Sequence, residues 1–212
     1  SAGSVGNAIL EGAPKNWTIT DGGIVAVPFV STWNTANTSG GSSASNQVKL
    51  PLRTSAIYNF VVDWGDGNTD TITVWNQPQT THTYATSGTY TITITGTIND
   101  WAFDGNGDRL KILSISSWGS LQLNSTSVIN FSGCANLDLS SVSDIFNINS
   151  NTSLSDMFRN CTTLTTINNI NSWDISSVTN ISAMFINCDN FNQSLNSWNT
   201  SSVQSMQGIF YN

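Results

Sequence analysis

Apolar and hydroxyl side chains alternate most regularly at residues 89–98, which read TYTITITGTI. In an extended chain, Tyr90, Ile92 and Ile94 point to one side and the threonines point to the other. An antiparallel sheet with one buried face and one solvated face produces this period of two. We therefore predict a strand here, with the isoleucines in the core.

Further strands are predicted upstream, where β-branched and aromatic residues gather between turn signals. The stretch NTANTSGGSSASN at 34–46 has no apolar pattern and predicts a mobile loop. Short strands separated by such turns favour an antiparallel β-sandwich. The predicted strands cover residues 23–33, 47–52, 57–64 and 69–75, with Gly65-Asp66-Gly67 between the last two.

The second half of the chain repeats itself every 25–27 residues. The segments FSGCANL (131–137), FRNCTTL (158–164) and FINCDNF (185–191) share a pattern of Phe, two residues, Cys, two residues and an apolar side chain. INSWDISSV and LNSWNTSSV also align, and SSVQSMQGIF begins a fourth copy. A period in this range indicates stacked units that bury their apolar edges against one another, which is a solenoid.

Each unit is expected to contain a short helix, a turn and a strand. In SSVTNISAMF, the residues Val178, Ile181, Met184 and Phe185 fall on one face of a helix, and Ser176 or Ser177 is placed to cap it. After the cysteine, TTLTTINNI predicts a strand that points Leu164 and Ile167 inward. The fourth copy stops at Asn212, one residue before the expected cysteine, so we expect a cut chain, a continuation or a docked partner.

Cys134, Cys161 and Cys188 are spaced by 27 residues each time. An odd number at equal spacing predicts one buried, reduced core position that is refilled in each repeat. Bridges between neighbouring units are the alternative, although disulfide frameworks favour even counts and irregular spacing. A zinc site is unsupported, because no paired cysteines accompany them.

The composition narrows the possible partners. Only 9% of the 212 residues are charged, the net charge is −7, and no basic patch is present, so nucleic-acid binding is not expected. No apolar run is long enough to span a membrane, and no signal peptide is visible, although a chain that starts at Ser1 suggests processing or trimming. Hydroxyl and amide side chains take the place of charges, as is common in secreted, β-rich proteins.

The segments VVDWGDGNTDTITVW and THTYATSGTYTITITGTI resemble the PKD domain, an immunoglobulin-like sandwich of extracellular proteins. The WGDG turn of that family stands at Trp64 to Gly67, and its H-x-Y and G-x-Y elements stand at His82, Tyr84, Gly88 and Tyr90. The resemblance covers roughly residues 25–98. It implies a spacer or binding module and no enzymatic activity.

The repeats from Met157 to Phe210 resemble the BspA-like leucine-rich-type surface repeat, also known from mycoplasma surface lipoproteins. That resemblance covers about residues 110–212 and implies adhesion to host proteins, cells or glycans. It weakens at residues 138–153, an irregular insertion, and in LKILSISSWGSLQL, a partial first unit. The expected fold is mainly β with short helices: an Ig-like, PKD-like antiparallel β-sandwich followed by a short leucine-rich-repeat-type solenoid. The expected divisions are 1–24 for an N-terminal arm or first strand, 25–100 for the sandwich and 101–212 for the repeats.

Two acidic turns are candidate calcium sites. Asp63, Asp66 and Asp70 surround a glycine turn, and Asp104, Asn106 and Asp108 alternate in DGNGD. For the first, the preferred interpretation is that Asp66 accepts backbone N–H bonds that fix the turn; for the second, it is a plain turn that lacks the distal glutamate of a calcium loop. We therefore predict no metal, cofactor or catalytic residues.

The remaining candidates are a histidine and three tryptophans. His82 is the only histidine, and we expect it to have a structural, hydrogen-bonding role. Trp118, Trp173 and Trp198 suit stacking on sugars, but their place in the repeats favours packing.

No motif of catalysis is present. The predicted function is a non-enzymatic, surface-exposed module that binds protein or glycan without inserting into the membrane, in an extracellular or cell-surface location. The alternative is a structural subunit of an assembly, such as a phage virion decoration or fibre protein or a surface-layer protein, in which the partners are neighbouring subunits.

Overall fold

The structure is a computed structural model, and it describes residues 26–54, 56–121, 129–148 and 153–211. The described residues are mainly β and contain no α-helix, only two short 3-10 helices, η1 (Pro78–Thr80) and η2 (Ile170–Ser172). The prediction of a short helix in each repeat unit is therefore wrong. The strands are β1 (Phe29–Asn34), β2 (Gln47–Lys49), β3 (Tyr58–Asp63), β4 (Thr69–Ile72), β5 (Thr81–Thr83), β6 (Thr89–Ile98), β7 (Trp101–Ala102), β8 (Ile112–Ser117) and β9 (Ile129–Asn130).

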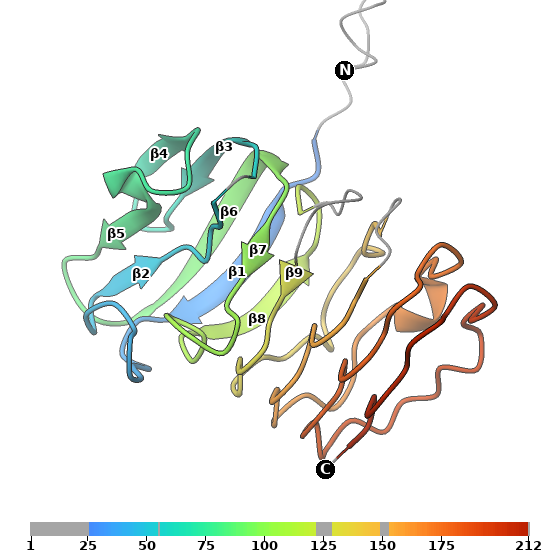
Figure 1. The fold of residues 1–212 in the computed structure, drawn as a ribbon. Helices are drawn as coiled ribbons and strands as arrows, with labels where there is room; N and C mark the ends of the chain where they lie inside the picture. Colours follow the sequence, from blue (N-terminus) through green and yellow to red (C-terminus); the bar gives the residue numbers. More distant parts are fainter. Residues whose placement is uncertain (1–25, 55, 122–128, 149–152, 212) are drawn as a thin grey trace, which may run out of the picture.

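A five-stranded antiparallel sheet in the order β4-β3-β6-β1-β8 forms the first half of the molecule (Figure 1). β6 lies at its centre, pairing Ile94 with Phe29 of β1 on one side and with Val62 of β3 on the other. Ile92 and Ile94 are buried, whereas the threonines between and beside them are exposed or half-buried. The predicted alternation along β6 is thereby confirmed.

The buried face of this sheet is covered by aromatic side chains from the segments that follow it. Trp101 of β7 contacts Phe29 and Trp33 of β1 in edge-on geometry, with ring centroids 5.1 and 6.3 Å apart. β2 and β5 form a separate two-stranded antiparallel sheet, whose Val48 joins the same core. Because one hydrophobic cluster runs from these strands into the repeats, the two halves share a core.

β8 joins the two halves. Residues 110–123 are expected to be a partial first repeat, but Ile112–Ser117 pairs antiparallel with β1 as the last strand of the sheet. Its other edge forms a parallel bridge from Ser114 to Asp138, and the N–H of Asp138 donates to the carbonyl of Leu113 at 2.8 Å. The sheet therefore extends past residue 100, and β8 is also the surface on which the repeats stack.

Successive repeat units lie side by side from yellow to red in Figure 1. They are linked by isolated parallel bridges, from Leu139 to Ile167 and from Asn180 to both Ser153 and Ser205. The strand predicted in TTLTTINNI is reduced to the single bridge at Ile167. The prediction that Leu164 and Ile167 point inward is confirmed, since both are fully buried.

Left-handed residues explain why the repeats form turns in place of helices. Gly133, Asn160 and Asn187, each one residue before a cysteine, have φ angles of 79°, 59° and 54°. A second set, four residues earlier in the second and third units, comprises Asp156, Ala183 and their counterpart Gly208, with φ angles of 57°, 58° and 63°. A residue with positive φ interrupts a right-handed helix, so the two in the second unit and the two in the third exclude a helix there. Ser176 and Ser177 consequently have no helix to cap.

Among the described residues, no helix combines the length and apolar character that crossing a bilayer requires.

Candidate binding sites

The three aspartates around the Gly65–Gly67 turn serve the turn itself. Asp63 accepts the N–H of Gly65 at 2.9 Å, and Asp66 accepts the N–H of Asn68 at 3.1 Å. Asp70 accepts the indole N–H of Trp64 at 2.9 Å. The predicted role of Asp66 in fixing the turn is confirmed. Gly65 is required there, because a Cβ would lie 2.3 Å from the carbonyl oxygen of Thr91.

His82 closes the same turn from β5. Its Nε2 lies 2.8 Å from Oδ2 of Asp66, and its ring stacks on Trp64 with centroids 4.8 Å apart. Burial tends to raise the pKa of Asp66, but the hydrogen bonds from His82 and Asn68 outweigh it and lower that pKa. Tyr84 meets His82 edge-on and donates its hydroxyl to the carbonyl of Trp64 at 3.0 Å. The predicted structural role of His82 is confirmed.

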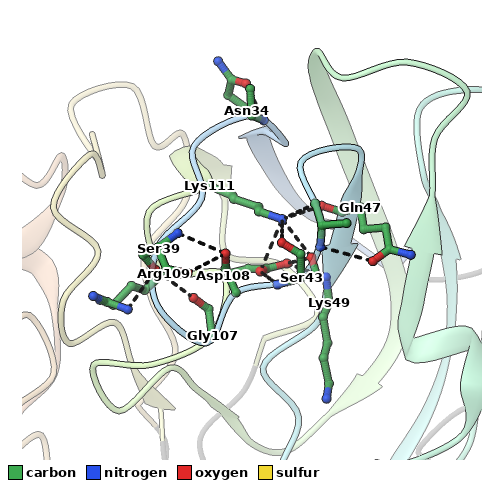
Figure 2. A network of polar contacts seen from close by, with 12 residues as sticks. Asn34, Ser39, Ser43, Gln47, Lys49, Gly107, Asp108, Arg109 and Lys111 are labelled. Carbon is green, nitrogen blue, oxygen red and sulfur yellow. Dashed lines mark hydrogen bonds and ion pairs between the residues drawn. The ribbon is translucent and has the colours of Figure 1, made fainter.

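The two aspartates of the second acidic turn, Asp104 and Asp108, have different partners and different burial. Asp104 forms an ion pair with Arg53 at the surface, whereas Asp108 is buried. Asp108 accepts the N–H of Ser43 at 2.7 Å, the hydroxyl of Ser43 at 2.6 Å and the N–H of Lys49 at 2.7 Å. The predicted turn is present, but Asp108 is also the centre of a buried polar network that the sequence did not predict (Figure 2).

Lys111 is the second charged member of this network and is also fully buried. Its Nζ donates to the carbonyls of Ser43, Ala44 and Gln47 at 2.8–3.0 Å and lies 3.4 Å from Asp108. Burial lowers the pKa of Lys111, and the neighbouring Asp108 opposes that shift. These hydrogen bonds from Lys111 fix Ser43 and Ala44 within the loop at 34–46, which the sequence predicts to be mobile.

The described residues contain no group of three or more His, Cys, Asp or Glu side chains arranged to hold a metal ion. In both acidic turns, the carboxylates that could have served as ligands have protein partners.

The three cysteines are free and buried. The thiol of Cys161 donates to the carbonyl of Phe131 at 3.2 Å, and the thiol of Cys188 donates to that of Phe158 at 2.9 Å. Burial raises the pKa of all three thiols, that of Cys188 to about 11. The prediction of one refilled core position is confirmed, and the alternative of bridges between units is wrong.

The repeat tryptophans are part of the core. Trp118, Trp173 and Trp198 are all buried, and the indole N–H of Trp198 donates to the carbonyl of Ile170 at 2.9 Å. Trp118 and Trp173 contact each other edge-on at 6.2 Å. Packing is therefore the correct interpretation, and these rings cannot stack on a sugar.

Trp75 is the exposed tryptophan of the described chain, with 42% of its surface accessible. The sequence predicts a strand through residue 75, but β4 ends at Ile72, and a turn closed by Gln77 carries Trp75. The side-chain oxygen of Gln77 accepts the N–H groups of Thr73 and Val74 at 2.8 and 3.1 Å, and its amide donates to the carbonyl of Thr71 at 2.8 Å. This side chain takes the place of a strand partner and holds the turn rigidly.

Two pockets flank the segment 49–52 next to this turn. One, of about 250 Å³, is lined by Trp75, Gln77 and the segment itself. The other, of about 190 Å³, lies between the same segment and the loop at 103–108, beside the buried Asp108. Lys49, Leu50 and Leu52 line both pockets. Aromatic, aliphatic and polar groups thus lie on one surface, formed by Lys49, Leu50, Leu52, Trp75 and Gln77, which we call the Trp75 surface.

Comparison with known proteins identifies the second half of the chain. A family model described as "Mycoplasma protein of unknown function, DUF285" matches residues 99–212, slightly more than half of the 212 residues. No curated protein and no solved structure matches the chain.

Proposed function

The chain belongs to the DUF285 family of mycoplasma proteins of unknown function, and from that premise we propose that it is a non-enzymatic, surface-exposed module that binds protein or glycan. In this proposal, residues 25–100 are a PKD-like, immunoglobulin-like sandwich, and residues 101–212 are a short BspA-like solenoid of leucine-rich type. The match to a mycoplasma family is compatible with the resemblance to mycoplasma surface repeats.

The observation that carries the proposal is the Trp75 surface. Exposing a large aromatic ring is unfavourable in water, and here the backbone leading to the ring is fixed by three hydrogen bonds of Gln77. A rigid aromatic side chain beside small pockets with a few polar groups is typical of recognition sites, because little conformational entropy is lost on binding. The flat face of an indole also fits the apolar face of a sugar ring.

A non-enzymatic role is supported by the partners of the reactive side chains. His82 and Asp66 bind each other, Asp108 and Lys111 are buried together, and the three thiols are buried with raised pKa values. Groups held in this way have neither the access nor the poise that general acid, base or nucleophilic catalysis requires.

Binding to glycan arrays and to intact host cells tests the proposal. We expect Trp75→Ala to weaken binding about tenfold or more, as the loss of a central aromatic contact does in protein interfaces. The matched control is Phe210→Ala, which removes an exposed aromatic ring, 53% accessible against 42% for Trp75, from the last repeat unit. Equal binding by wild type and Trp75→Ala would exclude this surface.

The second candidate function is a structural subunit of an assembly, such as a virion decoration or fibre protein or a surface-layer protein. Its support is a cluster of exposed apolar side chains at the end of the repeat stack, where Met206, Phe210 and Tyr211 are 50%, 53% and 70% accessible. Apolar clusters of this kind mark contact surfaces. Gold-labelled antibody on the native source distinguishes the candidates: labelled cell envelopes support the binding module, and labelled particles or lattices support the subunit.

A further inference from the structure

Lys49 lies between the two pockets of the Trp75 surface and lines both of them. Its backbone N–H donates to the buried Asp108, but its side chain is exposed and points away from the polar network in Figure 2. The other basic side chains that the structure describes have protein partners: Arg53, Arg109, Lys111 and Arg159 bind Asp104, Ser39, Asp108 and Asp156, respectively. Among the described residues, the ammonium of Lys49 is thus the cation that is left for an external anion.

The surroundings of Lys49 suit a single negative charge. None of the described residues that line the pocket at Trp75 carries a carboxylate, and both oxygens of Asp108 in the other pocket already accept protein hydrogen bonds. The whole chain has a net charge of −7, so a ligand with many negative charges would be repelled. One ammonium therefore fits one carboxylate, and a sulfated or phosphorylated polymer lacks the basic patch that it needs.

Each pocket also contains an uncommitted amide. Asn76 lines the pocket at Trp75, and Asn106 lines the pocket beside Asp108. Within the described chain, neither of these two side chains makes a hydrogen bond. A primary amide offers donors and an acceptor together, so it can bind neighbouring hydroxyl groups of a sugar ring.

The main chain of the segment 49–52 is closed to an extended peptide. Pro51 has no N–H, and its carbonyl accepts the N–H of Ala102 at 2.9 Å. A peptide that extends a sheet needs open main-chain donors and acceptors, so recognition at this segment must use side chains. The remaining N–H groups of the segment donate within the protein at 2.7–2.9 Å, those of Lys49, Leu50 and Leu52 to Asp108, Thr80 and Leu50, respectively.

We propose that the Trp75 surface binds an oligosaccharide that contains a carboxylate-bearing sugar, and that Lys49 pairs with this carboxylate. The inference rests on the proposed binding function of the surface and specifies its ligand. The ring of Trp75 packs on the apolar face of one sugar, and the amides of Asn76 and Asn106 bind hydroxyl groups. Because the pockets lie on either side of Lys49, the acidic sugar and its neighbour occupy one pocket each.

Calorimetric titration of the whole chain with two acidic saccharides tests the proposal. The probes are 3′-sialyllactose, which carries a sialic acid, and cellobiouronic acid, which carries a glucuronate. Each is compared with its own methyl ester, in which the charge is removed and the shape is kept. We expect at least one acid to bind about fivefold more tightly than its ester, with the difference narrowing as salt rises. The acid that binds identifies the source of the carboxylate.

Variants at Lys49 assign the preference to its ammonium. Lys49→Gln is expected to bind the acid as weakly as wild type binds the ester, and Lys49→Arg is expected to retain most of the preference. Arg159→Gln is the matched control, because it removes the same charge from a repeat unit and should leave the preference unchanged. The side chain of Lys49 is exposed, so these variants should unfold at the wild-type temperature.

The outcomes separate this inference from the proposed function. A wild-type preference for the acid that survives in Lys49→Gln would overturn the inference. Equal binding of acid and ester that is lost in Trp75→Ala would also overturn it, while leaving the Trp75 surface as a site for neutral glycans. Binding that Trp75→Ala does not weaken, or no binding of either acid, would overturn the inference as well, and the first of these results would exclude the Trp75 surface itself.

Discussion

Both the sheet and the repeats bury apolar cores, but they satisfy their backbone hydrogen-bonding groups in different ways. In the sheet, long strands pair along their length, and alternation alone separates buried from exposed side chains. In the repeats, strands are reduced to single bridges, and order comes from contacts between residues 24–29 positions apart. Regular secondary structure is therefore one way to satisfy buried backbone groups, and stacking of identical turns is another.

Side chains supply the bonds that strands would otherwise make. Asn190 donates to the carbonyl of Thr162 at 2.7 Å, Ser202 donates to that of Ser176 at 2.6 Å, and Ser197 donates to that of Asn171 at 2.8 Å. These side-chain bonds run from a later unit to an earlier one, whereas most backbone bonds between units run from an earlier unit to a later one, as from the N–H of Phe158 to the carbonyl of Met184. They explain why asparagine and serine are abundant where charged residues are scarce.

The largest expected effect concerns the stacked rings of Phe131, Phe158, Phe185 and Phe210, one from each repeat unit. Phe158→Ala removes a buried ring between two others, and we expect the free energy of unfolding to fall by about 3–5 kcal/mol. Phe210→Ala changes the same repeat position where one face is already open, so its effect should be about 1 kcal/mol or less. Urea unfolding of both variants measures the difference. Equal losses would show that the last unit is as well covered as the second.

The second prediction concerns the buried pair beside the sheet. Lys111→Met leaves Asp108 charged and without its cation, so we expect a loss of about 3 kcal/mol or more in the free energy of unfolding. The double variant Lys111→Met with Asp108→Asn removes both charges and should recover part of that loss. Denaturant unfolding of the single and double variants checks this. A double variant less stable than the sum of the two single variants predicts would contradict it.

The third prediction concerns how the free energy of unfolding depends on pH, because the buried thiols of the repeats and the buried Lys111 beside the sheet affect it in opposite directions. The folded pKa values of the three thiols lie above the unfolded value of 9.0, so their contribution is complete below pH 9 and is lost as pH rises toward the folded values. We expect about 1 kcal/mol to be lost per thiol at pH 10. Lys111, whose pKa is lowered, acts in the opposite direction. A variant with alanine at all three cysteines should therefore lose less stability between pH 8 and pH 10 than wild type does.

The smallest expected effect concerns one left-handed position in two units. Gly208→Ala forces a side chain into positive φ, although the nearest atom to its Cβ would be 3.7 Å away, so the cost is conformational strain of about 1 kcal/mol. Ala183→Gly should stabilise the protein by a similar amount, because Ala183 already has a φ of 58°. Thermal unfolding of the two variants measures both signs. A destabilised Ala183→Gly would show that packing of the alanine methyl group outweighs strain.

The sequence predicted local features better than it predicted which strands pair with each other. The alternation along β6 and the inward side chains Leu164 and Ile167 follow from hydrophobic burial alone. The place of β8 beside β1 depends on a contact about 80 residues away in the chain, which periodicity does not encode. The helix prediction failed because apolar spacing of three and four residues also fits a stacked turn. Asparagine or glycine before each cysteine was the signal for left-handed backbone that could have corrected it.

The candidate sites were predicted less well. The turn around Asp66 and His82 has local sequence signals, and its structural role was recognised. The burial of Asp108 and Lys111 was missed, although a lysine within the apolar segment LKILSIS was a signal for a buried cation. Trp75 was assigned to a strand, because nothing local shows that Gln77 replaces the strand partner from Thr71 to Val74.

Amide hydrogen exchange of the wild-type chain tests the central claim, that the repeats stack through backbone hydrogen bonds between successive units. The account predicts slow exchange at Ile181, Ala183 and Phe185, whose N–H groups donate to the last unit, and fast exchange at their counterparts Met206, Gly208 and Phe210, whose N–H groups have no acceptor in the described chain. Slow exchange along β6 provides the internal reference. Equal protection of the two sets would contradict the account, because the N–H groups of Met206, Gly208 and Phe210 would then already be bonded.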